Sequence, residues 1–201
     1  MSNFDIRFFG DPVLRTRAAE VTTVDGALVK VTQRMIQTMY DAPGLGLAAP
    51  QVGISKRLFV YDLHDGEGAH VLVNPVIKES RGEWSYDEGC LSVPGLSWEI
   101  VRPKEIHIVG FDLDGNSVDM EATELMSRLY QHEMDHLDGK LLLDFLPEDE
   151  RVDALRVLRG RILEQGHAGD PETPKKAPKG AKLGDPAPAK NRFGISLPGL
   201  K

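Results

Sequence analysis

Gln131-His132-Glu133-Met134-Asp135-His136-Leu137-Asp138-Gly139 is the stretch around which the fold is expected to form. It contains the pattern H-E-x-x-H inside a segment with helical periodicity. Residues four apart share one face of an α-helix, roughly 6 Å apart along its axis, so His132 and His136 can bind one metal ion. Glu133 can act as a general base toward water on that metal. The stretch predicts metal-assisted hydrolysis.

H-E-x-x-H alone is a weak signal, because two histidines and a glutamate can also form a solvated stripe on a helix. A tetrahedral catalytic site needs a third protein ligand. The extended peptidase pattern H-E-x-x-H-x-x-G-x-x-H would place a histidine at position 142, but the chain has Leu142 there. The carboxylates further along the chain are Glu148, Asp149, Glu150 and Glu164. The first three open a predicted helix, where the helix dipole alone explains acidic residues.

Cys90 is the remaining candidate for the third ligand. It is the one cysteine of the chain and lies in a loop-like stretch, residues 88–92, between segments that predict strands. A single cysteine is more often a small buried hydrophobic residue, and it could also be a nucleophile paired with a histidine. Coordination is preferred because it also gives Glu133 a function.

Length and composition predict one compact domain, residues 1–165, which would carry the catalytic motifs. The formal charge is -7 and the pI about 5.4, which argues against general affinity for nucleic acid or an anionic membrane. A single cysteine cannot form an intramolecular disulfide and favours a cytoplasmic location. No stretch has the length of a membrane span or the pattern of a secretory signal.

Residues 166–201 are expected to form a separate, disordered tail. They are rich in Pro, Lys, Ala and Gly and cannot bury enough apolar surface to offset the entropy lost on ordering. Seven basic and three acidic residues give this tail a charge of +4. It is interpreted either as a flexible linker or as a segment that contacts ribosomal RNA or another acidic surface.

Three longer helices are predicted. The first begins after a cap at Asp25 and ends before Pro43, with apolar residues at helical spacing between them. The second contains the H-E-x-x-H stretch, with Thr123 as its cap and Gly139 as its stop. The third begins at Pro147, because proline is favoured in the first turn of a helix.

Strands are predicted between the first two helices. The expected segments are 57–63, 70–77, 98–101, 105–111 and 117–120, with a turn at 113–116. Because no helix separates these segments, an antiparallel or mixed sheet is favoured over a doubly wound one. The small-residue run 44–53 is expected to form no regular element and to line a binding site.

Three segments together resemble the signature motifs of the peptide deformylase family. They are Gly44-Leu45-Gly46-Leu47-Ala48-Ala49-Pro50-Gln51, Glu88-Gly89-Cys90-Leu91-Ser92 and Gln131-His132-Glu133-Met134-Asp135-His136. The motifs occur in the family's order, and the similarity extends from about Phe8 to the last helix. It implies an α+β fold with mixed, mainly antiparallel sheets around a central metal-binding helix, and with N-terminal and C-terminal helices.

The resemblance also implies a hydrolase that removes the N-formyl group from the initiator methionine of newly synthesised polypeptides and releases formate. The implied metal ligands are Cys90, His132 and His136. The metal is usually ferrous iron in this family, although this donor set also suits zinc, nickel or cobalt. Glu133 would be the general base, and Gln51 with the backbone N–H of Leu91 would stabilise the oxyanion.

The substrate-binding residues follow from the same resemblance. Gly46 is similar to the glycine whose backbone meets the substrate, and Gly44 would help backbone approach closely. The methionine side chain needs an apolar pocket, for which the candidates are Leu45, Leu125 and Leu129.

Arg128 is a further candidate for substrate binding. It stands one turn before His132, where an apolar residue also occurs in the family, and its head is expected to leave the pocket for solvent or to bind peptide carbonyls. Glu88 and Arg102 are expected to pair and to fix the Cys90 loop.

Two other functions remain open on the residues alone. One is a zinc peptidase or other amidase with the H-E-x-x-H pattern, and the other is a non-catalytic peptide-binding module of the same fold. Formate release from formyl-methionyl peptides would separate both from a deformylase.

Overall fold

Residues 3–166 are described by a computed structural model, and the chain divides into two compact units, Met1–Leu146 and Pro147–Lys201. The described part of the second unit is the helix α3, Glu148–Gly166. Apart from Gly166, which ends α3, the predicted tail lies outside the described residues, so its disorder and the domain boundary after residue 165 stay predictions. Among the described residues, no helix is long and apolar enough to cross a membrane.

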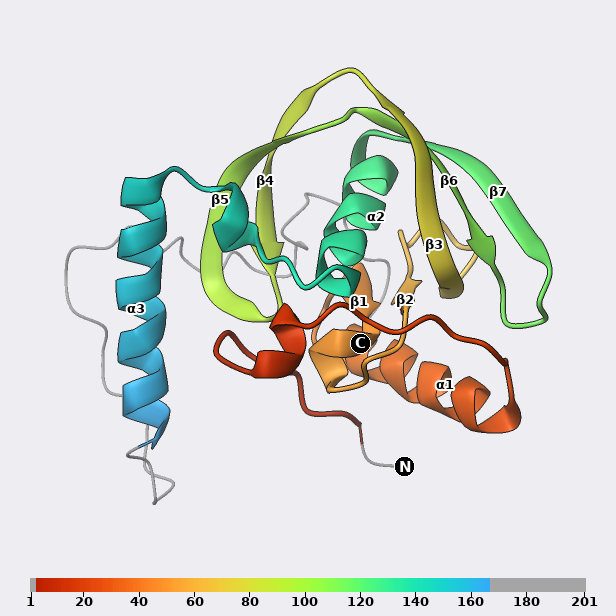
Figure 1. The fold of residues 1–201 in the computed structure, drawn as a ribbon, viewed down its shortest axis with the longest axis horizontal. Helices are drawn as coiled ribbons and strands as arrows, with labels where there is room; N and C mark the ends of the chain where they lie inside the picture. The colour runs from red at the N-terminus through yellow and green to blue at the C-terminus, as the bar shows by residue number, and fades with distance from the viewer. Residues whose placement is uncertain (1–2, 167–201) are drawn as a thin grey trace. The chain divides into compact units, whose positions relative to one another are not determined.

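Two antiparallel sheets form the first unit (Figure 1). The five-stranded sheet has the order β1-β2-β3-β6-β7, and the two-stranded sheet is the hairpin β4–β5. The strands are β1 Gly46–Ala48, β2 Leu58–Tyr61, β3 His70–Arg81, β4 Trp84–Cys90, β5 Val93–Arg102, β6 Glu105–Phe111 and β7 Ser117–Thr123. The predicted α+β architecture is therefore confirmed.

Two helices complete the first unit, together with short 3-10 helices. In α1, Gly26–Asp41, the side chain of Asp25 caps the helix by accepting a hydrogen bond of 2.8 Å from the backbone N–H of Leu28. Thr123 precedes α2, Glu124–Leu137, without a side-chain cap hydrogen bond. Figure 1 shows α2 between the β4–β5 hairpin and the strands β3, β6 and β7. The 3-10 helices are Pro12–Arg15, Ala49–Val52 and Leu142–Phe145.

The core fixes both helices against the larger sheet. Residues buried on α1 pack with residues of β1 and β2: Leu28, Met35, Met39, Leu47, Leu58 and Val60. On α2, the fully buried Tyr130 lies 5.7 Å from the ring centre of Phe59 and 4.9 Å from that of Tyr61. Because Tyr130 is two residues before His132, this packing sets the position of the H-E-x-x-H stretch.

Two local predictions were wrong. Residues 44–53 were expected to form no regular element, but β1 and the 3-10 helix Ala49–Val52 lie there, with Gly53 at φ +81° closing the segment. The stretch 88–92 was expected to be a loop, but β4 continues to Cys90. In both cases pairing with a neighbouring strand supplies the backbone hydrogen bonds, which overrides the weak strand propensity of small and polar residues.

Candidate metal and active site

The candidate site is assembled from three segments that are distant in the sequence. Cys90 is the last residue of β4, where the hairpin turns through two residues and Cys90 pairs with Val93. His132 and His136 come from one face of α2, as the helical spacing predicted. Gln51 comes from the 3-10 helix that follows β1.

The three predicted ligands converge. One donor atom from each of Cys90, His132 and His136 can be chosen so that all lie within 4.8 Å of one another. The sulfur of Cys90 is 3.2 Å from Nε2 of His136, and the two imidazole rings have centres 5.0 Å apart. Cys90 and His136 are buried, and His132 is partly buried. Among the described residues, this is the one group of three or more such side chains close enough to hold a metal.

The electrostatics of the site favour a thiolate. Burial raises the pKa of Cys90, but positive charge on His136 and His132, with their hydrogen bonds, outweighs burial and holds this pKa well below its usual value. Burial lowers the pKa of His132, yet hydrogen bonds to Cys90 and Glu88 hold it well above its usual value. A cation is therefore favoured between these groups, and a metal ion can replace the protons.

The residues fit a catalytic metal centre. A thiolate and two imidazoles are ligands for zinc and for other divalent transition metals, and three protein ligands leave a position open for water or substrate. A second observation concerns Nδ1 of His132, which lies 3.1 Å from Oε2 of Glu88. Such a carboxylate behind a histidine is the usual partner of a metal-bound imidazole, because it fixes the tautomer and the ring orientation.

Glu133 is buried against β1. Its side chain is 2% exposed, and its Oε2 has no hydrogen-bond partner among the described residues. Burial raises the pKa of Glu133 to about 7, against the lowering effect of positive charge on His132 and His136. A carboxyl group with a pKa near neutrality can both accept and return a proton.

Gly46 makes room for this carboxyl group. A Cβ atom at Gly46 would overlap Oε1 of Glu133 and would lie 2.7 Å from Cδ1 of Leu129. Both distances are shorter than a Cβ atom normally makes, so a larger residue would displace the ends of these two side chains. Glycine at this position therefore lets β1 approach α2 without moving Glu133.

Gln51 points toward the ligand set. Its Oε1 accepts a hydrogen bond of 2.8 Å from the backbone N–H of Ala48, which orients the amide. Its Nε2 donates to Oγ of the fully buried Ser92 at 3.2 Å and lies 3.8 Å from the sulfur of Cys90. Ser92 was not identified from the sequence as a functional residue, although it lies within the second motif. The adjacent Leu91 lies in the two-residue turn of the hairpin.

Four charged residues form an ionic cluster behind His132, namely Glu88, Arg102, Arg128 and Asp135. The predicted pair of Glu88 and Arg102 forms, with hydrogen bonds of 2.6 and 3.0 Å. Although burial raises the pKa of Glu88, hydrogen bonds from His132 and Arg102 and their positive charge lower it to about 2. Arg102 also donates to Asp135 at 2.8 Å. No sequence pattern indicated that Asp135 belongs to this network.

The prediction that the head of Arg128 reaches solvent was wrong. The residue is 3% exposed, and its guanidinium group donates to Glu88 and to the backbone carbonyls of Trp84 and Ile100. The physical reason is that Arg128 lies on the side of α2 that faces the hairpin. The carboxylate of Glu88 on β4 and the two backbone carbonyls accept hydrogen bonds from both terminal nitrogens of the buried guanidinium group.

The three leucines predicted for the methionine pocket differ in their surroundings. Leu129 is buried beside Gly46, because its Cδ1 would lie only 2.7 Å from a Cβ atom at that glycine. Leu45 is also buried, and Leu125 is partly buried. Their contribution to substrate binding stays a prediction, as does that of Gly44.

The sequence and the fold both match known proteins. The polypeptide deformylase family model matches residues 4–152. The chain belongs to this family.

Peptide deformylases from several bacteria are similar to the chain. The enzyme of Acidothermus cellulolyticus is 50% identical over 154 residues, which cover 77% of this chain and 84% of that protein. The peptide deformylase of Halothermothrix orenii is 43% identical over 144 residues, covering 72% and 94%. The crystal structure of a peptide deformylase from Legionella pneumophila has a TM-score of 0.78 at 39% identity and covers 83% of this chain and 99% of that one.

Family membership gives the activity. The chain is a metal-dependent hydrolase that removes the N-formyl group from the N-terminal methionine of nascent polypeptides. The comparisons give no support to the zinc peptidase, other amidase or non-catalytic module considered from the sequence.

Proposed function

We propose that Cys90, His132 and His136 hold the metal ion for deformylation and that Glu133 moves the protons. The observation that carries this proposal is the convergence of the three donor atoms beside a buried carboxylate that has an unpaired oxygen. A divalent cation held there would supply a Lewis acid that acidifies water and polarises a carbonyl.

The proposed proton path uses Glu133 twice. The carboxylate takes a proton from the attacking water as the oxygen of that water bonds to the formyl carbon. Glu133 then delivers the proton to the departing amine as the C–N bond breaks, which yields formate and the free N-terminus. A pKa of about 7 for Glu133 supports both transfers near neutral pH.

We propose that Gln51 and the backbone N–H of Leu91 stabilise the developing negative charge on the formyl oxygen. Gln51 is supported by its orientation, because Ala48 fixes the amide oxygen while Nε2 faces the ligand set. One well-placed donor of this kind is worth about 2.7 to 4 kcal/mol in the barrier. Gly44, Gly46, Leu45, Leu125 and Leu129 are proposed to contact the substrate.

Two substitutions separate metal binding from proton transfer. Glu133→Ala is expected to retain the metal and to lower turnover by about 10²- to 10⁴-fold, because a general base is lost. Cys90→Ala is expected to lose the metal itself. Formate release from a formyl-methionyl peptide and metal content are measured on the same preparations. A Glu133→Ala enzyme with a near-normal rate would refute the assignment of the base.

Ferrous iron is the proposed metal. One thiolate and two imidazoles suit iron, zinc, nickel and cobalt, so the support for iron is the family resemblance. Metal analysis of protein purified without oxygen, combined with the formate assay after reloading with each ion, tests the proposal. A zinc-filled protein that is fully active would contradict it.

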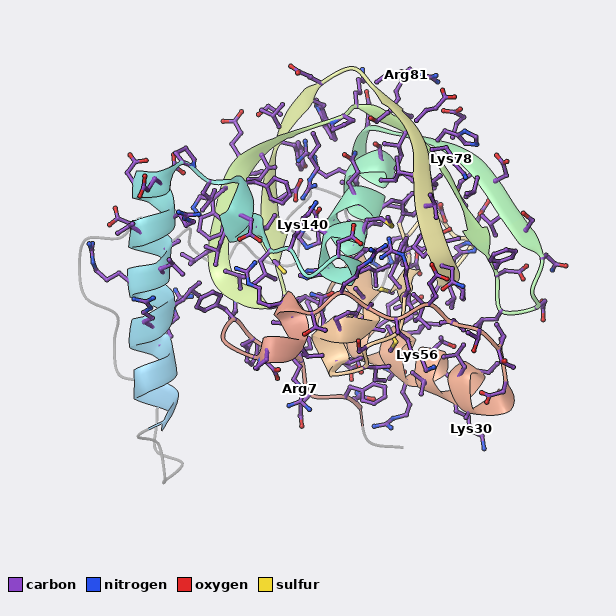
Figure 2. All side chains as sticks on the ribbon, in the orientation of Figure 1. Arg7, Lys30, Lys56, Lys78, Arg81 and Lys140 are labelled. Carbon is purple, nitrogen blue, oxygen red and sulfur yellow. The ribbon has the colours of Figure 1, made fainter. Side chains whose placement is uncertain are left out.

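We further propose a cytoplasmic location, where nascent chains are made, and ribosome association through the basic tail. The support is the +4 charge of residues 166–201 in a chain of net charge -7. In Figure 2, basic side chains of the first unit lie at separate places around the ribbon: Arg7, Lys30, Lys56, Lys78, Arg81 and Lys140.

Co-sedimentation with ribosomes tests the role of the tail. The variants are a chain without residues 167–201 and a full-length chain in which the tail lysines and arginine are replaced by glutamine. Both are expected to lose association while formate release from a short peptide is unchanged. Undiminished sedimentation of the truncated chain would leave the tail as a flexible linker.

A further inference from the structure

Arg128 ties the helix that carries the histidines to the hairpin that carries Cys90. Its Nη1 donates to Oε1 of Glu88 and, at 3.0 Å, to the backbone carbonyl of Ile100, and its Nη2 donates to the carbonyl of Trp84. These partners lie on both β4 and β5. The carbon of its guanidinium group is also 5.0 Å from the ring centre of Trp84. One side chain of α2 therefore contacts both strands of the hairpin.

The carboxylate of Glu88 has no spare acceptor position. Oε1 accepts from Nε of Arg102 at 2.6 Å and from Arg128, and Oε2 accepts from Nη2 of Arg102 at 3.0 Å. Oε2 also lies 3.1 Å from Nδ1 of His132. A carboxylate offers about four lone-pair positions, and all four are used here. Rotation of Glu88 would break at least one of these bonds, so Arg128 and Arg102 together fix its plane.

We infer that Arg128 is a positioning residue for the metal centre. It holds Glu88 in the orientation that accepts the Nδ1 hydrogen of His132, which leaves Nε2 of that ring as the metal donor. It also keeps the Cys90 hairpin in register with α2. This inference replaces the predicted contact with peptide carbonyls, because both terminal nitrogens of Arg128 donate to groups of the chain itself and its Nε is buried. It rests on the proposed ligand set.

The test measures how fast the full-length protein releases its metal. Arg128→Met keeps an apolar stem and removes the donors, whereas Arg128→Lys keeps the charge without the planar fork. The proteins are loaded with Co²⁺, and release to a chromogenic chelator is followed together with the Co²⁺ absorption spectrum. Loss of such a supporting contact typically costs 10- to 100-fold in metal affinity, so Arg128→Met is expected to release Co²⁺ about 10-fold faster. Arg128→Lys should fall between Arg128→Met and the parent protein.

Arg57, which immediately precedes β2, provides a matched control because it contacts the same helix. It is 7% exposed, donates to Asp138 at 2.7 Å and lies 3.9 Å from the sulfur of Met134. Arg57→Met also removes a buried guanidinium group that anchors α2, but none of these contacts involves Glu88. It is expected to lower the unfolding temperature about as much as Arg128→Met while the release rate of Co²⁺ stays at the parental value.

A double variant tests the route through Glu88. In the Glu88→Gln background, the additional Arg128→Met substitution should accelerate Co²⁺ release by much less than 10-fold, because the carboxylate on which Arg128 acts is already gone. An undiminished effect in this background would overturn the inference.

Other results would also overturn it. A parental release rate with a raised KM for the formyl peptide would assign Arg128 to substrate binding. Equal acceleration by Arg57→Met would reduce Arg128 to general stability. If Arg128→Met does not fold, a parental release rate and spectrum for Arg128→Lys count against the inference. Metal release does not depend on turnover, so failure of the formate assay would refute the proposed function separately.

Discussion

The β1 segment, residues 46–52, and the ionic cluster border the same ligands but are built on opposite principles. The β1 segment is small and uncharged, and it acts by steric fit, with Gly46 against Glu133 and Gln51 against Cys90. The ionic cluster is charged and buried, and it acts through hydrogen bonds that end on His132. The difference suggests that the two regions have different functions. Changes in the β1 segment should affect turnover, whereas changes in the ionic cluster should affect metal affinity and stability.

Among substitutions in the ionic cluster, Glu88→Gln should have the largest effect on stability and metal affinity. It leaves two buried guanidinium groups facing a neutral amide, and breaking a buried ion pair typically costs about 3 to 5 kcal/mol of unfolding free energy. We also expect metal affinity to fall about 10- to 100-fold. Urea unfolding and competition with a chelator measure the two effects. A variant with parental metal affinity and reduced kcat would contradict the assignment of the ionic cluster to metal binding and stability.

Among substitutions in the β1 segment, Gly46→Ala should have the largest effect on kcat. The new methyl group would overlap Oε1 of Glu133, so the carboxyl group must move. A displacement of about 1 Å can cost on the order of 10²-fold in rate, and we expect a loss of that size in kcat with metal content unchanged. Gly26→Ala is the matched control, because a Cβ there meets nothing within 4 Å. Loss of metal from Gly46→Ala would contradict the expectation that the β1 segment affects turnover alone.

The two regions also differ in what the sequence could predict. Spacing alone placed His132 and His136 on one helix face, because local geometry fixes that relation. Elimination favoured Cys90 as the third ligand and the family resemblance supported it, but no local pattern could place Cys90 beside α2, because its contact with His136 joins residues 46 positions apart. The strand of residues 46–48 was missed for the same reason.

The ionic cluster was only partly predictable. Opposite charges suggested the pair of Glu88 and Arg102, and the structure has it. Nothing in the sequence pattern distinguished Arg128 from a solvent-exposed arginine on a helix. Its burial depends on Glu88 and on two backbone carbonyls from distant strands, and those become neighbours only when the hairpin packs against α2.

Asp135→Asn tests whether a member of the ionic cluster that is not hydrogen-bonded to His132 has a smaller effect on metal affinity. Asp135 accepts a hydrogen bond of 2.8 Å from Arg102, and its side chain is 16% exposed. We expect a loss of about 2 kcal/mol in unfolding free energy, the scale of a hydrogen bond to a charged group. Metal affinity should fall less than in Glu88→Gln, because Arg102 keeps both bonds to Glu88. An equal fall would mean that the cluster acts as one unit.

Ser92→Ala should have the smallest effect on kcat. It tests the β1 segment indirectly, because Ser92 belongs to the hairpin and contacts Gln51. Ser92 touches Gln51 at 3.2 Å, and its loss removes one acceptor that holds the amide, at a cost of about 1 kcal/mol. That corresponds to a decrease of about 5-fold in kcat, with KM and metal affinity unchanged. Ser85→Ala is the control from the same hairpin, because its hydroxyl donates to the exposed Glu99. If Ser92→Ala instead lowers metal affinity, Ser92 belongs with the metal-holding side, and Gln51 is oriented by Ala48 alone.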